Sequence, residues 1–203
     1  MTKREINELD ETRTVYIKKQ DKGFTLIRNG APFKIKGATG NSHLDALAAI
    51  GANTLRVYDY ENIKSILDEA QQHNLAVIVD IPLAKYTDDA NFYSDEIQIA
   101  RFRDTLKKLV RTYKDHPALL FWNLGNELDY PLVLRKNEFI KTFNGFIDLI
   151  HKEDPNHPVG TSIIPSKTET LSIHLHSPQL DLIGFNAFGN LNMIKPLLNK
   201  ITS

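Results

Sequence analysis

The pair Asn126-Glu127 ends a long hydrophobic run, and Glu127 brings a carboxyl group to that point. The run begins at Ala118 and reads Ala-Leu-Leu-Phe-Trp-Asn-Leu-Gly before the pair. A continuous apolar run is typical of a parallel strand that is buried on both faces. A carboxyl group at the end of such a strand is a candidate proton donor or acceptor for a substrate. The structural alternative is a surface glutamate that caps the following loop.

The composition indicates a globular domain with a real core. The 203 residues are 41% hydrophobic and 25% charged, close to the averages for such domains. Lys plus Arg and Asp plus Glu number 25 each, so no net charge favours nucleic acid or an anionic membrane as a partner. Cysteine is missing from the sequence, which excludes disulfides, zinc-thiolate sites and cysteine nucleophiles.

Short β-rich runs alternate with amphipathic helical stretches, a pattern that predicts βα units and a parallel sheet. A hairpin of residues 14–17 and 24–27, turned through 21–23, is expected to cover one end of this sheet as a lid. Core strands are expected at 33–36, 54–58, 75–81, 118–127, 159–164 and 182–187. Helices are expected at 43–50, 63–70, 95–113, 139–150, 168–176 and 191–201.

This alternation predicts an α/β fold of the TIM (β/α)8 type with about six βα units. A complete barrel of this type takes about 250 residues, so the sequence predicts an incomplete barrel that lacks two units. We expect residues 1–30 to form an N-terminal extension with the hairpin and residues 31–203 to form the partial barrel. The start of the chain lacks the apolar core of a signal peptide, and we find no segment of about 18 apolar residues for a membrane span.

Four segments in the expected order resemble one family of barrel enzymes. They are residues 29–37 on entry to the barrel, 51–56 at the second strand, 122–127 at the fourth and 181–186 at the sixth. On these segments the chain resembles a retaining glycoside hydrolase of clan A, closest to the barrel domain of family 2. The resemblance implies a glycoside or oligosaccharide substrate and no cofactor. The localisation stays open, because such enzymes are often exported.

The resemblance also implies roles for residues at strand ends. Glu127 matches the general acid/base of the clan, and Asn126 matches the residue that hydrogen-bonds the sugar 2-hydroxyl. Arg56 matches an arginine that holds the nucleophilic carboxylate ionised and oriented. An internal ion pair of Arg56 with Asp80 or Asp59 is an equally good interpretation.

Further residues near the expected mouth of the barrel are candidates for substrate contacts: Asn186, His43, Asn41, Tyr58 and Asp59. The family commonly has Asn-x-Tyr on strand six, whereas this sequence has Phe188 in place of the tyrosine. Trp122 could offer an apolar face to a sugar, but its early position in the strand favours core packing. No metal site is expected, because His174 and His176 are spaced two apart and do not share a helical face.

The catalytic nucleophile of the family belongs at the end of a seventh strand, which this sequence is not expected to contain. We therefore expect a glycosidase domain with impaired catalysis. Two alternatives remain open: a non-catalytic carbohydrate-binding or complementation module that pairs its open sheet edges with itself or another chain, and a β-glucan transglycosidase suggested by the segment 55–59.

Overall fold

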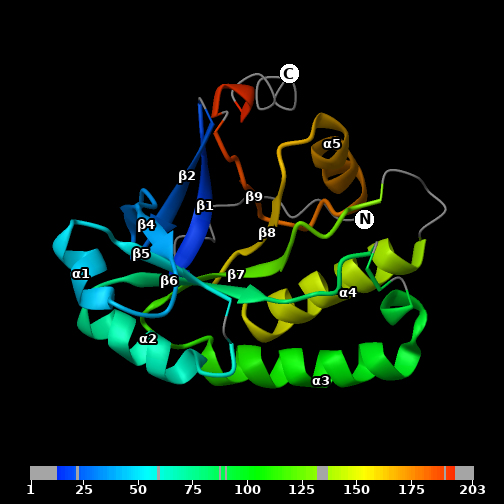
Figure 1. The fold of residues 1–203 in the computed structure, drawn as a ribbon, viewed down its shortest axis with the longest axis horizontal. Helices are drawn as coiled ribbons and strands as arrows, with labels where there is room; N and C mark the ends of the chain where they lie inside the picture. Colours follow the sequence, from blue (N-terminus) through cyan, green and yellow to red (C-terminus); the bar gives the residue numbers. More distant parts are fainter. Residues whose placement is uncertain are drawn as a thin grey trace.

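Six parallel strands form a curled half-barrel at the centre of the molecule (Figure 1). The computed structural model describes residues 13–21, 23–58, 60–86, 88–89, 91–131, 137–189 and 191–194. The strands lie side by side in chain order, and every neighbouring pair is parallel. They are β4 (Gly37–Thr39), β5 (Thr54–Val57), β6 (Ala76–Ile81), β7 (Leu119–Asn126), β8 (Val159–Ile163) and β9 (Leu182–Phe185). The predicted incomplete α/β barrel is therefore confirmed.

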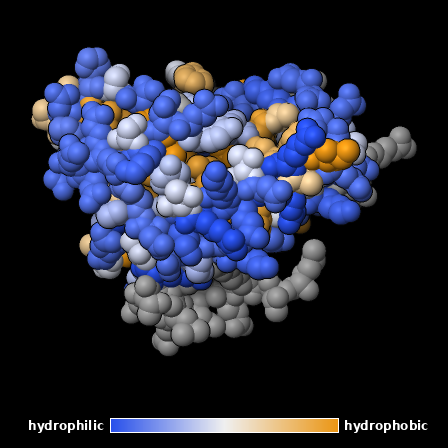
Figure 2. Space-filling view, turned by 90° about the horizontal axis from the view of Figure 1, so that it is seen from below, coloured by the Kyte–Doolittle hydropathy of each residue, from blue (hydrophilic) through white to orange (hydrophobic). Residues whose placement is uncertain are grey.

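Helices connect the strands, as parallel pairing requires. They are α1 (Leu44–Ala49), α2 (Ile63–Gln72), α3 (Glu96–Tyr113), α4 (Asn137–Glu153) and α5 (Lys167–His176), with short 3-10 turns η2 (Phe92–Ser94) and η3 (Leu191–Met193). Figure 1 shows α2, α3 and α4 together in one layer below the sheet. From that side the surface is mostly hydrophilic, with hydrophobic residues gathered in small areas (Figure 2).

The aromatic side chains Phe139, Phe143 and Phe146 of α4 pack into the core against the sheet and η2. Phe139, Phe143 and Phe146 are fully buried, and the rings of Phe139 and Phe143 stack with centroids 5.8 Å apart. Trp122 is also fully buried, and its Nε1 donates to the Oδ2 of Asp154 at 2.8 Å. The predicted core packing of Trp122 is confirmed.

The predicted N-terminal hairpin is present as β1 (Val15–Gln20) and β2 (Gly23–Arg28), extended by β3 (Ala31–Pro32). Val15, Leu26 and Phe33 form a second hydrophobic cluster with inward-facing residues of the sheet, among them Ile78 and Phe121. The hairpin stands on the side of the sheet opposite α3 (Figure 1). The Val15 amide donates to the Asn156 carbonyl at 3.2 Å and the Arg28 Nη2 donates to the Pro117 carbonyl at 2.8 Å, just before β8 and β7 begin. The hairpin therefore lies at the amino end of the half-barrel, which agrees with the predicted lid over one end of the sheet.

The first core strand was predicted too early, at residues 33–36. The structure places β4 at Gly37–Thr39. The side chain of Asn53 explains the difference, because it bonds the preceding segment: its Oδ1 accepts from the Lys36 amide at 2.9 Å, and its Nδ2 donates to the Lys34 carbonyl at 2.9 Å. A side chain therefore takes the place of ladder bonds along that stretch, and the parallel pairing with β5 begins at Gly37.

Several predictions concern parts of the chain at or beyond the described residues. Of the predicted last helix, the structure describes η3 and Ile194, and the remainder lies outside the described residues. The boundary at residue 30 stays a prediction, since residues 1–12 lie outside them as well. Strands β4 and β9 form the two edges of the six-stranded sheet, and pairing through these edges also stays a prediction. No helix among the described residues is long and apolar enough to cross a membrane.

Candidate functional site

A buried ion pair lies on the inner face of the sheet between β5 and β6. The Nε and Nη2 of Arg56 donate to the two carboxylate oxygens of Asp80 at 2.6 and 2.8 Å. The side chain of Asp80 is 3% exposed and that of Arg56 is 17% exposed. Burial acts to lower the pKa of Arg56, but the hydrogen bonds and charge of Asp80 outweigh burial and raise this pKa. The interpretation of Arg56 as half of an internal pair with Asp80 is confirmed.

The same guanidinium fixes two amide side chains at the carboxyl ends of β7 and β9. The Nη2 of Arg56 donates to the Oδ1 of Asn126 at 3.0 Å, and its Nη1 donates to the Oδ1 of Asn186 at 3.4 Å. Arginine has no acceptor, so both amides must turn their oxygens toward it. The Nδ2 of Asn186 then donates to the Oδ1 of Asn126 at 2.9 Å and to the Oε1 of Glu127 at 2.7 Å.

Glu127 follows β7 with a left-handed backbone, at a φ of 54°. Its amide donates to the Ser162 carbonyl on β8 at 2.7 Å, which ties the turn to the neighbouring strand. Gly125 has a φ of 76°, and a Cβ there would lie 2.4 Å from a Leu128 methyl group. Glycine at this position therefore lets the chain turn sharply over Leu128, and that turn carries the Glu127 carboxyl group toward Asn186.

Two further side chains adjoin this cluster. The Nζ of Lys85, on the loop after β6, lies 3.9 Å from the Oε2 of Glu127, whose side chain is 22% exposed. The Tyr58 ring lies over the Arg56 guanidinium, with the Arg56 Cζ 4.9 Å from the ring centroid. Tyr58 is 49% exposed, so part of the ring faces solvent beside the cluster. Burial raises the pKa of Tyr58 above its ordinary value.

The structure thus brings together Glu127, Asn126, Arg56, Asn186 and Tyr58 at the carboxyl end of the sheet. Asn41 and His43 follow β4 at the same end and are exposed, and no described contact joins their side chains to the cluster. Asp59 lies outside the described residues. The catalytic and substrate-binding roles of all these residues stay predictions.

Sequence reasoning missed two supports beneath the cluster. The Nδ2 of Asn123 donates to the Oδ1 of Asp80 at 2.5 Å and to the Gly125 carbonyl at 3.0 Å. The Ser162 hydroxyl donates to the Oδ1 of Asn123 at 3.2 Å. The alternation of side chains along a strand could have indicated Asn123, because it shares the inner face of β7 with Phe121.

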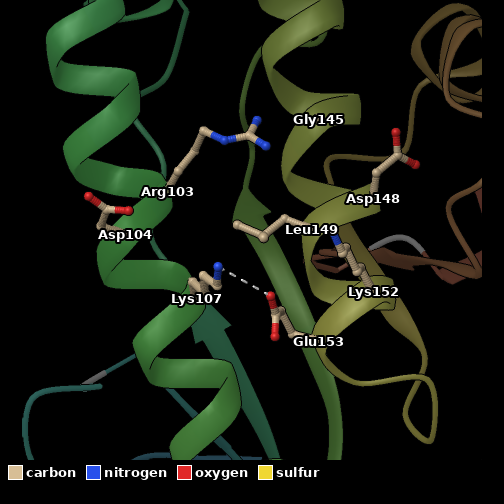
Figure 3. A pocket seen from close by; sticks show the side chains of 8 residues that line it. All are labelled: Arg103, Asp104, Lys107, Gly145, Asp148, Leu149, Lys152 and Glu153. Atoms are coloured by element: carbon tan, nitrogen blue, oxygen red, sulfur yellow. Dashed lines mark ion pairs between the residues drawn. The ribbon is translucent and has the colours of Figure 1, made fainter.

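A groove of about 350 Å³ lies elsewhere, between α3 and α4 (Figure 3). Its walls carry both signs of charge, and Lys107 Nζ lies 3.7 Å from a Glu153 carboxylate oxygen. It opens among the helices rather than at the carboxyl ends of the strands, so it is separate from the Glu127 cluster. No group of three or more potential metal ligands occurs in the described part of the chain.

A parallel half-barrel with polar side chains at the carboxyl ends of its strands is the arrangement in which TIM-barrel enzymes keep their active sites. Comparison with known proteins gives the family: the model of the cellulase family, glycosyl hydrolase family 5, matches residues 4–176. The chain belongs to this family. The predicted membership of a clan A glycosidase family is thereby confirmed, whereas the closer resemblance to family 2 stays a prediction.

Relatives that are named for different activities match the chain. Mouse β-glucuronidase is 24% identical over 92% of this chain and 30% of its own length. Mannan endo-1,4-β-mannosidase F of Aspergillus clavatus is 25% identical over 77% of this chain and 33% of its own length. A Bifidobacterium dentium β-glucuronidase structure, complexed with coumarin-3-O-glucuronide, superposes with a TM-score of 0.70 at 20% identity, over 94% of this chain and 33% of that one. The chain spans a third or less of the length of the curated relatives it matches.

Proposed function

We propose that this chain carries the acid/base part of a retaining β-glycosidase site, with Glu127 as the general acid/base. The observation that carries the proposal is the hydrogen bond from the Asn186 Nδ2 to the Glu127 Oε1 at 2.7 Å, within a cluster held by Arg56. Because Oε1 accepts this bond, the Oε2 of Glu127, which lies 3.9 Å from the Lys85 Nζ and beyond hydrogen-bond distance of it, is the oxygen left to carry a proton to the leaving group. General acid assistance of this kind typically contributes a factor of about 10² to 10⁴.

Asn126 is proposed to bind the sugar. Its Oδ1 accepts from both Arg56 and Asn186, so its Nδ2 remains as the donor for a substrate hydroxyl. A hydrogen bond to the sugar 2-hydroxyl strengthens as the transition state forms. Asn186 and Tyr58 adjoin the same cluster through Asn126 and Arg56, and Asn41, His43 and Asp59 are proposed as further substrate contacts.

A retaining mechanism needs a second carboxyl group as nucleophile, about 5 to 5.5 Å from the acid/base. Asp80 does not suit this role, because it is 2% exposed and both its oxygens are bound by Arg56. We therefore propose that the nucleophile comes from outside the described residues and that these residues alone catalyse poorly. A form lengthened by two further βα units should then raise kcat by several orders of magnitude.

Hydrolysis of paired aryl β-glycosides by the lengthened form tests the acid role of Glu127. One substrate of each pair carries a good leaving group such as 2,4-dinitrophenol and the other a poor one such as phenol. Glu127→Gln should lower kcat/KM for the poor leaving group by about 10² to 10⁴, and much less for the good one, since a good leaving group needs little protonation. Glu138→Gln, an exposed change at the start of α4, is the matched control.

Either of two results would speak against the proposal. Equal losses for both leaving groups in Glu127→Gln would remove the acid role. Binding of oligosaccharides with no hydrolysis in any form of the protein would favour the non-catalytic carbohydrate-binding alternative. Glucuronides, mannosides and glucosides all belong in the panel, because the relatives are named for different sugars.

A further inference from the structure

The segment that follows β7 holds an unusual backbone. Glu127 and Asp129 both have left-handed conformations, with φ angles of 54° and 55°. Residues other than glycine adopt this conformation at a cost, and it persists where the surroundings fix it. The carboxyl group of Glu127 stays near Asn186 through this turn, so whatever fixes the turn also fixes the proposed acid/base.

Neighbouring elements hold the segment from two sides. On one side, the Tyr86 amide donates to the Leu128 carbonyl at 3.2 Å. On the other side, α5 contributes side chains: the Tyr130 amide donates to the Oε1 of Glu169 at 3.1 Å, and the Ser172 hydroxyl donates to the Pro131 carbonyl at 2.9 Å. Both α5 bonds act on backbone atoms, and that of Glu169 lies closer to Glu127 along the chain.

Glu169 stands in a sequence context that predicts a different use for it. Ser166 and Glu169 have the spacing of a capping box, in which serine bonds the glutamate amide and the glutamate side chain bonds the serine amide. The first half is present, since the Glu169 amide donates to the Ser166 Oγ at 3.2 Å. In the described part of the chain, however, the carboxylate accepts from Tyr130 instead of completing the box.

This carboxylate is costly to keep where it is. Glu169 is partly buried, and burial raises its pKa, with the charges of Asp129 and Glu127 adding to the effect. Glu169 stands in the first turn of α5, where the helix dipole favours a carboxylate, but that preference does not decide which amide the carboxylate bonds. Its bond to the Tyr130 amide is what links α5 to the backbone after Glu127.

We propose that Glu169 is a positioning residue whose side chain holds the backbone after Glu127 and so keeps the Glu127 carboxyl group in reach of Asn186. Its catalytic meaning rests on the proposed function. The position of the Glu127 carboxyl group can be measured in the protein without substrate, so this test needs no turnover.

Nuclear magnetic resonance of the full chain tests the proposal with three variants. Glu169→Ala removes the acceptor, Glu169→Gln keeps an acceptor without the charge, and Ser166→Ala removes the helix cap but leaves the carboxylate. The readouts are hydrogen exchange of the Tyr130 amide, measured against the Leu124 amide in β7, and the side-chain NH₂ signals of Asn186. If Glu169→Ala does not fold, Glu169→Met replaces it, because methionine has a side chain of similar length but no oxygen.

We expect Glu169→Ala to accelerate exchange at Tyr130 about tenfold and to move the Asn186 signals toward those of Glu127→Ala. Glu169→Gln should stay within about threefold of the parent, and Ser166→Ala should loosen the amides of α5 but not that of Tyr130. Unchanged Tyr130 exchange and unchanged Asn186 signals in Glu169→Ala would overturn the proposal, as would equal effects of Ser166→Ala and Glu169→Ala.

The outcomes separate this inference from the proposed function. If no form of the protein hydrolyses glycosides but Glu169→Ala still displaces the Asn186 signals, the positioning stands and the glycosidase role fails. If hydrolysis depends on Glu127 but the signals do not respond to Glu169→Ala, the glycosidase role stands and the positioning fails. Where hydrolysis is measurable, Glu169→Ala should lower kcat more than it changes KM, and Glu169→Gln should restore kcat.

Discussion

The two ends of the sheet are built on the same strands but held together differently. At the amino end, Ile78 and Phe121 face inward and pack against the hairpin through apolar contact. Two residues further along the same strands, Asp80 and Asn123 face inward and meet through a hydrogen bond of 2.5 Å. Residues two apart in a strand lie on the same face. The inner face of these strands therefore packs against the hairpin at the amino end and supports the candidate site at the carboxyl end.

The difference teaches how each end responds to change. An apolar contact is non-directional, so the amino end depends mainly on the volume it buries. The carboxyl end is a chain of matched donors and acceptors that runs through Arg56, Asp80, Asn123, Asn126 and Asn186. Removing one member leaves its buried partners without bonds, and such a loss costs more than the bond itself contributed.

The largest expected effect on stability is at Arg56. Arg56→Ala leaves the Asp80 carboxylate buried without its bidentate partner, and we expect a loss of about 3 to 5 kcal/mol in the free energy of unfolding. Urea unfolding followed by fluorescence of Trp122 measures this loss. The double variant Arg56→Ala/Asp80→Asn is the control and should recover part of it, because the buried charge is gone. A loss below about 1 kcal/mol in Arg56→Ala would mean that water replaces the pair.

Ile78→Ala probes the amino end of the same region. Its side chain is 8% exposed, and truncation should cost about 3 kcal/mol through lost burial and the cavity left behind. The Asn186 side-chain signals should stay where they are, since no polar partner is removed. Ile97→Ala, on the 66% exposed side chain of Ile97 in α3, is the matched control and should change stability by less than about 0.5 kcal/mol. Displaced Asn186 signals in Ile78→Ala would show that the two ends are coupled.

Sequence reasoning was strong where burial alone decides the outcome. The order of strands and helices follows from apolar periodicity, and the helix predicted at 139–150 is present and contributes Phe139 and Phe143 to the core. It failed at the first strand, where the Asn53 side chain replaces ladder bonds that periodicity cannot detect. Side-chain bonds to a distant backbone leave no periodic trace.

The same limit applies to the candidate site. Glu127 could be proposed because it stands at the end of an apolar run, and Asn126 and Arg56 because they match residues of the family that the sequence resembles. Their supports could not, because a bond such as that from the Tyr130 amide to Glu169 depends on how α5 lies against the loop after β7. The sequence even favoured another partner for Glu169, the amide of Ser166, and tertiary contact overrode that local preference.

The smallest expected effect concerns a polar residue that acts locally. Asp95 caps α3, where its Oδ1 accepts from the amides of Ile97 and Gln98 at 2.9 and 3.0 Å. The side-chain hydrogen bond from Gln98 lowers the pKa of Asp95 in the folded protein. A lowered folded pKa means that ionised Asp95 stabilises the fold above the unfolded value of about 4, and that this stabilisation is lost as the pH falls through the folded pKa.

Asp95→Asn keeps a capping oxygen but removes the charge. The parent should therefore be slightly more stable than Asp95→Asn at pH 7, and the gap should close as the pH falls below about 4. Urea unfolding of both proteins across this range measures the gap. A gap that persists at the lowest pH would show that the bond from the Gln98 side chain, rather than the charge, supplies the stabilisation. Asp95 takes no part in the hydrogen bonds that join Arg56 to Asp80, Asn126 and Asn186, so Asp95→Asn should leave the Asn186 signals unmoved. This result would distinguish a polar residue that stabilises one helix end from one that supports the candidate site.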